Sequence, residues 1–231
     1  SLDLLERKRI NQKAEIEIAI IKLPRISNFS DLDPFFREQS IQIKWVEPGE
    51  DIGIPDVLII PGSKQTIKDL EILNKTGMSN QIKDYAKNGG SIFGICGGLQ
   101  MLGESLEDPY QKESINEVAT SSFAGINLIP IKTRFGEIKH TKQREEIVSW
   151  PETTKLKGFE MHYGESDLNN KNNSNIIYLF KNTSLGWVHE KKDKSFVGGT
   201  YLHGIFENNI WRRQWLNKIR EKKGLNKLNL H

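Results

Sequence analysis

The first hundred residues alternate short apolar runs with helical patterns, and this alternation constrains the fold more than any other feature. Several apolar runs have no polar face, which is typical of strands in a parallel sheet that helices cover on both sides. We therefore expect an α/β fold with a doubly wound, mostly parallel sheet. The expected strands are 16–21, 41–46, 57–60 and 91–95, and the expected helices are 32–38, one from a Ser63 N-cap to Leu73, and one from about Met78 to the Asn88-Gly89-Gly90 turn.

The second half of the chain is richer in strand patterns. A closing helix is expected at 209–223, because Trp211, Trp215 and Ile219 share one helical face. The Asn-rich stretch 169–175 has the composition of a surface loop. The strands expected here are 126–134, 146–148, 159–165, 176–180, 186–189 and 196–201.

The strand and helix patterns indicate one main domain at 15–224. The polar, charged stretch 1–14 resembles a linker from a missing N-terminal domain, and 225–231 are expected to form a C-terminal tail.

Composition excludes several classes of protein. Lys and Arg number 33 against 30 Asp and Glu, and the basic residues are dispersed, so we expect no nucleic-acid partner. No apolar run approaches the roughly 18 residues that span a bilayer, and we expect no membrane association. A single cysteine, Cys96, excludes an internal disulfide and favours the reducing cytoplasm. We expect no metal site in this chain.

Cys96 stands between a predicted strand and a predicted helix, with Gly94 and Gly98 two residues away on either side. This is the G-x-C-x-G pattern of a nucleophile elbow, a strained turn that needs small neighbours and is expected to expose the sulfur. Main-chain N–H groups at the following helix start, Gly97 first, favour thiolate and stabilise an oxyanion. The alternative is an inert cysteine buried under a glycine-rich turn.

A nucleophilic cysteine needs a base, and His203 is the strongest candidate among the five histidines. It follows an apolar strand and precedes Gly204, at a strand end where open α/β sheets build their sites. His162 is second, and either could be a structural histidine. Gly62 and Ser63, which follow the third strand, are candidates for a further oxyanion N–H donor, although they are also compatible with a simple turn.

These motifs together resemble the class I glutamine amidotransferases, and in particular the amidotransferase half of the cobyric acid synthase family, over about 17–224. The cysteine and histidine motifs are shared by several amidotransferases and indicate the chemistry. The Leu-Pro-Arg-Ile-Ser-Asn-Phe stretch is more specific and indicates the corrinoid branch. The matching segments are 21–31, 60–66, 94–103, 158–162 and 199–206.

The resemblance implies a flavodoxin-like amidotransferase fold and a thioester mechanism. Cys96 would attack the carboxamide of glutamine, and His203 would protonate the departing ammonia and then activate water. The Gly97 N–H and the Gly62-Ser63 loop would hold the oxyanion, and Gln100 would help to seat glutamine. The ammonia would amidate carboxylates of a corrinoid, cobyrinic acid a,c-diamide, in cobalamin biosynthesis.

One departure from most class I amidotransferases concerns the residue that orients the histidine. Most members have a glutamate two positions after the histidine, and that position is Ile205 here. The cobyric acid synthase branch also lacks this glutamate. Glu160, Glu207 or a backbone carbonyl are the candidates for its replacement.

The resemblance also implies a second half, an ATP-binding domain that resembles dethiobiotin synthetase. No G-x-x-x-x-G-K-[ST] phosphate loop occurs in these 231 residues. We therefore expect no cofactor in this domain, with ATP, magnesium and most corrinoid contacts on the missing synthetase domain. Two alternatives remain: a stand-alone amidotransferase subunit of a cell-wall peptide ligase, and a non-catalytic docking module of the same fold.

Overall fold

The computed structural model describes residues 14–113, 122–169 and 175–229. The predicted linker at 1–14, except Ala14, lies outside the described residues. So do 170–174 of the predicted Asn-rich loop and 230–231 of the predicted tail.

A seven-stranded sheet forms the centre of the molecule. Neighbouring strands from β2 to β11 run parallel, whereas β10 and β9 add an antiparallel edge, so the predicted mostly parallel sheet is confirmed. In sheet order the strands are β2 (Ile41–Val46), β1 (Ile16–Ile21), β3 (Val57–Ile60), β4 (Ser91–Ile95), β11 (Phe196–Thr200), β10 (Gly186–Glu190) and β9 (Ile176–Tyr178).

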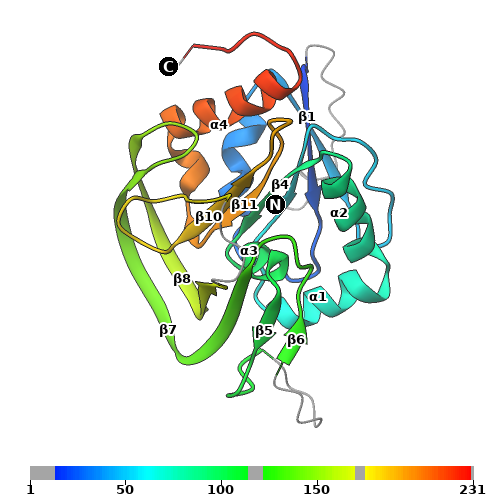
Figure 1. Ribbon diagram of the computed structural model, residues 1–231, viewed down its shortest axis with the longest axis vertical. Helices are drawn as coiled ribbons and strands as arrows, with labels where there is room; N and C mark the ends of the chain where they lie inside the picture. Colours follow the sequence, from blue (N-terminus) through cyan, green and yellow to red (C-terminus); the bar gives the residue numbers. More distant parts are fainter. Residues whose placement is uncertain (1–13, 114–121, 170–174, 230–231) are drawn as a thin grey trace.

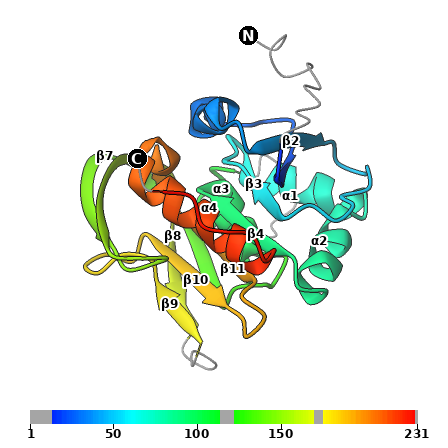
Figure 2. The same ribbon diagram turned by 90° about the horizontal axis from the view of Figure 1, so that it is seen from above.

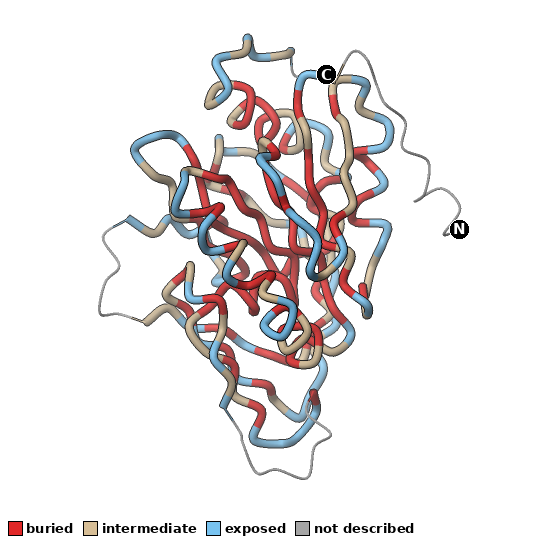
Figure 3. Tube along the Cα trace, turned by 90° about the vertical axis from the view of Figure 1, so that its right-hand side faces the viewer, coloured by how far each residue is buried: buried red, intermediate tan, exposed pale blue. Residues whose placement is uncertain are grey.

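The central strands are buried on both faces, as their sequences predict. Every residue of β3, β4 and β11 is buried, and Figure 3 shows buried residues gathered along the middle of the sheet. Helices α1 (Thr66–Lys75) and α2 (Met78–Lys87) lie on one side of the sheet, and α4 (Asn209–Lys222) lies on the other (Figures 1 and 2). The doubly wound arrangement is therefore confirmed.

The face under α4 has an aromatic core that also holds the segment after β1. Trp215 of α4 packs against Phe35, with ring centroids 5.8 Å apart, and against Phe206 at 5.0 Å. Phe35 belongs to η2 (Phe29–Arg37), a 3-10 helix where the sequence predicted an α-helix at 32–38. Pro34 lies inside this segment and has no N–H to donate, which disfavours a regular α-helix.

The predicted start of α1 was wrong by a few residues. The helix begins at Thr66 with Gln65, rather than Ser63, in the N-cap position. The Ser63 hydroxyl accepts a hydrogen bond from the Gln65 N–H and lies 2.7 Å from Asp69 Oδ2. Ser63 therefore stabilises the turn that precedes the helix.

A second, five-stranded sheet is built mainly from one long hairpin, β7 (Ile131–Val148) and β8 (Thr154–Leu168). The strands predicted at 126–134 and 146–148 are the two ends of β7, except that 126–130 lie outside any strand. The sequence did not predict one continuous strand, because the middle of β7 is polar and largely exposed on both faces. The remaining strands are β12 (Leu202–His203), β5 (Ser105–Glu107) and β6 (Ser122–Ala124).

The two sheets meet beside β12. This short strand comes just after β11 of the first sheet and pairs with β8 of the second, with His203 opposite Phe159. Among the described helices, none is long and apolar enough to cross a membrane.

Candidate active site

Cys96 occupies a strained turn between β4 and α3 (Gly97–Leu102). Its φ of 49° and ψ of −108° are unusual for a residue with a side chain. A Cβ atom on Gly98 would lie 2.0 Å from the Ile60 carbonyl oxygen, so only glycine fits there. The predicted elbow geometry is thus present. The predicted exposure is wrong, because Cys96 is only 6% exposed, and its Sγ lies 3.8 Å from the Met161 carbonyl oxygen of β8.

His203 lies next to Cys96, across Gly62. A Cβ atom on Gly62 would be 3.4 Å from His203 Cε1 and 3.7 Å from Cys96 Cβ. The His203 ring is 1% exposed and stacks on Phe159 with centroids 5.2 Å apart. Its Nε2 atom is buried and has no hydrogen bond of normal geometry within the described part of the chain. That nitrogen is available for proton transfer.

Asp31 orients the histidine. Its Oδ2 atom lies 2.7 Å from His203 Nδ1, and its Oδ1 accepts a hydrogen bond of 2.8 Å from the Gly204 N–H. Both side chains are almost completely buried. The carboxylate fixes the ring plane and leaves Nε2 as the reactive nitrogen.

The electrostatics of this arrangement favour the charged imidazolium. Burial lowers the pKa of His203, but the hydrogen bond to the Asp31 carboxylate and the interaction with Cys96 outweigh burial and raise the pKa to about 10. At neutral pH the ring therefore holds a proton that it can donate to a leaving group.

The sequence did not identify Asp31 as the orienting residue, and its two carboxylate candidates are wrong. Glu160 is buried, but its carboxylate contacts His162 Nε2 at 3.1 Å and Arg144. Glu207 is exposed in η3 (Ile205–Glu207). Asp31 lies 172 residues before His203, so no local spacing could indicate the pair. Its one signal was its position at the end of the segment that marks the corrinoid branch.

The structure brings the predicted oxyanion groups together. A Cβ atom on Gly97 would lie 3.0 Å from the Ser63 main-chain nitrogen, so these two residues face each other beside Cys96. Neither N–H donates to an acceptor among the described residues. The Ser63 hydroxyl is already engaged by Asp69 and Gln65, so the main-chain N–H is the group of Ser63 that remains for an oxyanion.

Gln100 and His162 lie in the wall of the site but are held by protein groups. Gln100 Nε2 donates to the Tyr201 hydroxyl at 3.2 Å, and its Oε1 accepts from Thr66 Oγ1 at 3.2 Å. His162 Nδ1 donates to the Gly164 carbonyl at 2.7 Å, and burial lowers its pKa. The predicted role of Gln100 in seating glutamine stays a prediction, and the contacts of His162 favour His203 as the base.

The described residues contain no group of three or more His, Cys, Asp or Glu side chains arranged to hold a metal ion.

A buried cysteine elbow and a carboxylate-held histidine on a doubly wound sheet define a class I glutamine amidotransferase-like domain. Solved structures show the same fold. A glutamine amidotransferase crystal structure has a TM-score of 0.62 at 13% identity, covering 90% of this chain and 99% of that one. A Thermotoga maritima glutamine amidotransferase has a TM-score of 0.54 at 17% identity, covering 92% and 86%.

The chain belongs to the CobB/CobQ-like glutamine amidotransferase domain family, whose model matches residues 17–211. Among curated relatives, a cobyric acid synthase of Prochlorococcus marinus (strain NATL2A) is 78% identical over 230 residues, covering 100% of this chain and 46% of the relative. A cobyric acid synthase of Prochlorococcus marinus (strain MIT 9313) is 51% identical over 226 residues, covering 97% and 45%. The chain thus spans about half the length of these relatives.

Proposed function

We propose that this chain is the glutamine-hydrolysing part of a cobyric acid synthase. The observation that carries the proposal is the buried series Asp31, His203 and Cys96, in which Asp31 holds Nδ1 of the histidine and the ring lies next to the elbow cysteine. The names of relatives 78% and 51% identical support the choice of this amidotransferase over others of the class.

The first half of the reaction forms a thioester. The Cys96 thiolate attacks the carboxamide carbon of glutamine, and the carbonyl oxygen becomes an oxyanion that the Gly97 and Ser63 N–H groups bind. The tetrahedral intermediate collapses as His203 Nε2 donates its proton to the departing nitrogen. Ammonia leaves, and the γ-glutamyl group stays on the sulfur.

The second half hydrolyses the thioester. His203 Nε2, now neutral, removes a proton from water, and the resulting hydroxide adds to the thioester carbon. The same N–H groups bind the new oxyanion, and its collapse expels the Cys96 thiolate and releases glutamate. Asp31 holds the ring through both steps, so Nε2 faces the reacting atoms in each protonation state.

The ammonia would be used by a partner domain. The relatives are about twice as long as this chain, which supports an ATP-dependent synthetase half in the same polypeptide. That half would hold ATP and magnesium and activate carboxylates of a corrinoid, cobyrinic acid a,c-diamide, for amidation in cobalamin biosynthesis. In this proposal 15–224 form the amidotransferase domain, 1–14 form the linker, and the enzyme acts in the cytoplasm.

A covalent-labelling experiment tests the glutaminase part. A diazo ketone analogue of glutamine should add to the protein once, because Cys96 is the only thiol, and excess glutamine should protect it. Cys96→Ser should remove the labelling and glutamate production. Labelling that persists in the variant would contradict the assignment of the nucleophile. Corrinoid amidation by the full-length enzyme, with glutamine or free ammonia as donor, tests the remaining part.

A further inference from the structure

The segment from Arg25 to Asp31 is hydrogen-bonded to the loop around Gly62 and Ser63, which we call the oxyanion loop. Ser27 N–H donates to the Gly62 carbonyl at 3.0 Å, and Lys64 N–H donates to the Arg25 carbonyl at 2.8 Å. The same segment ends at Asp31, which holds the base. One stretch of chain therefore contacts both the oxyanion loop and the catalytic histidine.

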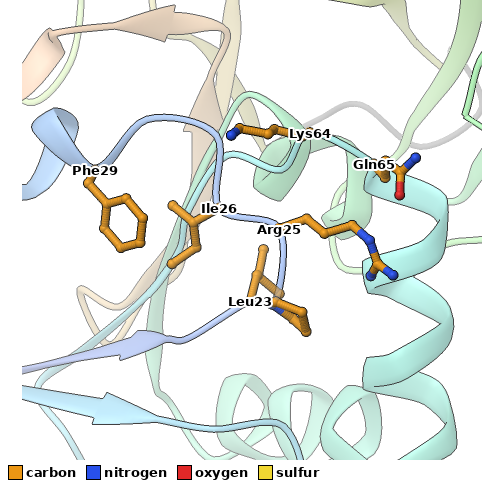
Figure 4. A pocket seen from close by; sticks show the side chains of 7 residues that line it. Leu23, Arg25, Ile26, Phe29, Lys64 and Gln65 are labelled. Atoms are coloured by element: carbon orange, nitrogen blue, oxygen red, sulfur yellow. The ribbon is translucent and has the colours of Figure 1, made fainter. Parts of the chain in front are cut away.

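Arg25 adds an ion pair to these backbone contacts. Its Nη1 atom lies 2.9 Å from Asp69 Oδ1, and the Arg25 side chain is 35% exposed whereas that of Asp69 is completely buried. Figure 4 shows the Arg25 side chain extended toward α1. The pocket that it lines has a volume of about 610 Å³. The pocket is lined by Leu23, Pro24, Arg25, Ile26, Phe29, Lys64 and Gln65.

Asp69 connects this ion pair to the oxyanion loop. Its second oxygen, Oδ2, accepts a hydrogen bond of 2.7 Å from the Ser63 hydroxyl. The same hydroxyl accepts the Gln65 N–H at 3.0 Å. Ser63 is therefore held by two hydrogen bonds of its side chain, and its main-chain nitrogen lies next to Gly97.

A fully buried carboxylate needs a compensating charge. In the described part of the chain, Arg25 is the one cation that pairs with Asp69. Without it, the buried charge of Asp69 would be left unpaired, which is strongly destabilising, and the carboxylate would have to move or admit water. Either change displaces the acceptor of the Ser63 hydroxyl, and a shift of about 1 Å in a reacting group can cost roughly 100-fold in rate.

We propose that Arg25 is a positioning residue for glutamine hydrolysis, which holds the Ser63 main-chain N–H in place through Asp69. The inference rests on the proposed glutaminase function and extends it to a residue that touches no reacting atom.

Arg25→Ala provides the first test, with Lys22→Ala as the matched control. Lys22 also forms an ion pair of 2.9 Å, but its partner Glu47 is exposed. We expect Arg25→Ala to lower kcat for glutamate production about 10- to 100-fold, since loss of one oxyanion donor costs about 100- to 1,000-fold. KM should stay within about threefold, and Lys22→Ala should match the wild type. Equal activity of the two variants would overturn the proposal.

Alkylation by iodoacetamide separates the oxyanion loop from the nucleophile. This reaction needs the Cys96 thiolate but forms no oxyanion, so its rate in Arg25→Ala should stay within about twofold of the wild type. A change in alkylation as large as the fall in kcat would mean that Arg25 supports the cysteine or the whole fold, which would overturn the proposal.

A charge-removing second substitution gives the final test. Asp69→Asn keeps an acceptor for the Ser63 hydroxyl and needs no cation, so Arg25→Ala should cost less than about threefold in kcat in that background. A fall in kcat caused by Arg25→Ala that is equally large with and without Asp69→Asn would contradict the proposed route through Asp69.

Arg25→Lys, which keeps the charge, replaces Arg25→Ala if the alanine variant fails to fold. Its kcat is expected to lie between those of the wild type and of an alanine variant. A wild-type chain that neither hydrolyses glutamine nor takes the diazo ketone label would refute the proposed function, and this inference with it.

Discussion

Replacement of Asp31 by Asn removes one negative charge from beside His203 and keeps nearly the same side-chain volume. The pKa of His203 is raised from 6.5 to about 10. At about 1.4 kcal/mol for each pH unit, this corresponds to roughly 5 kcal/mol of preference for the imidazolium. Asp31 and Cys96 both cause the rise, so Asp31→Asn should lower the pKa of His203 and leave its ring less firmly oriented. General acid–base catalysis contributes roughly 100- to 10,000-fold, and we therefore expect kcat for glutamine hydrolysis to fall about 100-fold.

The assay is steady-state glutamate production as a function of pH, with Asp33→Asn as the control. Asp33 lies on the same 3-10 helix but is exposed, so its substitution should leave kcat within about twofold of the wild type. The KM for glutamine should change little in either variant, because Asp31 acts through the histidine. Asp31→Asn activity within about threefold of the wild type would refute the assigned role.

The same substitution should change the pH dependence of stability. A histidine whose folded pKa is raised stabilises the protein fully below its unfolded pKa of about 6.5, and this contribution is lost as pH rises toward 10. The free energy of unfolding of the wild type should therefore fall between about pH 6.5 and 10. In Asp31→Asn the fall should be smaller, as denaturant titrations at several pH values would measure. An identical pH dependence in the two proteins would contradict the raised pKa.

Three further predictions concern the base, the shared glycine and the partner. His203→Ala should abolish ammonia release, whereas His162→Ala should retain at least part of it, and the reverse order in a glutaminase assay would assign the base to His162. Gly62→Ala should slow diazo ketone labelling at least tenfold, because its Cβ would lie 2.4 Å from Ser27 Oγ and would occupy the space between His203 and Cys96. Labelling at the wild-type rate would show that the glycine is not needed. Glutamate production by this chain should be slower than that of the full-length enzyme with ATP and corrinoid, since docking is expected to complete the site, and equal rates would show that the site needs no partner.

The sequence predicted the features that depend on local pattern. The four strands at 16–21, 41–46, 57–60 and 91–95 were found at their predicted bounds because each is a short apolar run bounded by polar or turn residues. The elbow was predictable because its glycines are required within two residues of Cys96. The long strand β7 was not, because its middle is polar and its pairing with β8, rather than its composition, makes it a strand.

The missed parts of the site depend on contacts between distant segments. Asp31 had no sequence spacing that related it to His203, and Arg25 had none that related it to Asp69. Both were visible only as members of a stretch typical of the corrinoid branch. The exposure of Cys96 was also mispredicted, because Met161 of β8 lies against its sulfur, and this depends on how the second sheet meets the first.

The order of the catalytic groups along the chain has a consequence for synthesis on the ribosome. The carboxylate, the nucleophile and the base come from residues 31, 96 and 203, and the 3-10 helix that carries Asp31 packs against Trp215 in the middle of α4. A nascent chain thus contains its complete thiol elbow before His203 has been added. The growing polypeptide therefore cannot bring the thiol and its base together until β7 and β8, which lie between them in the sequence, have been synthesised.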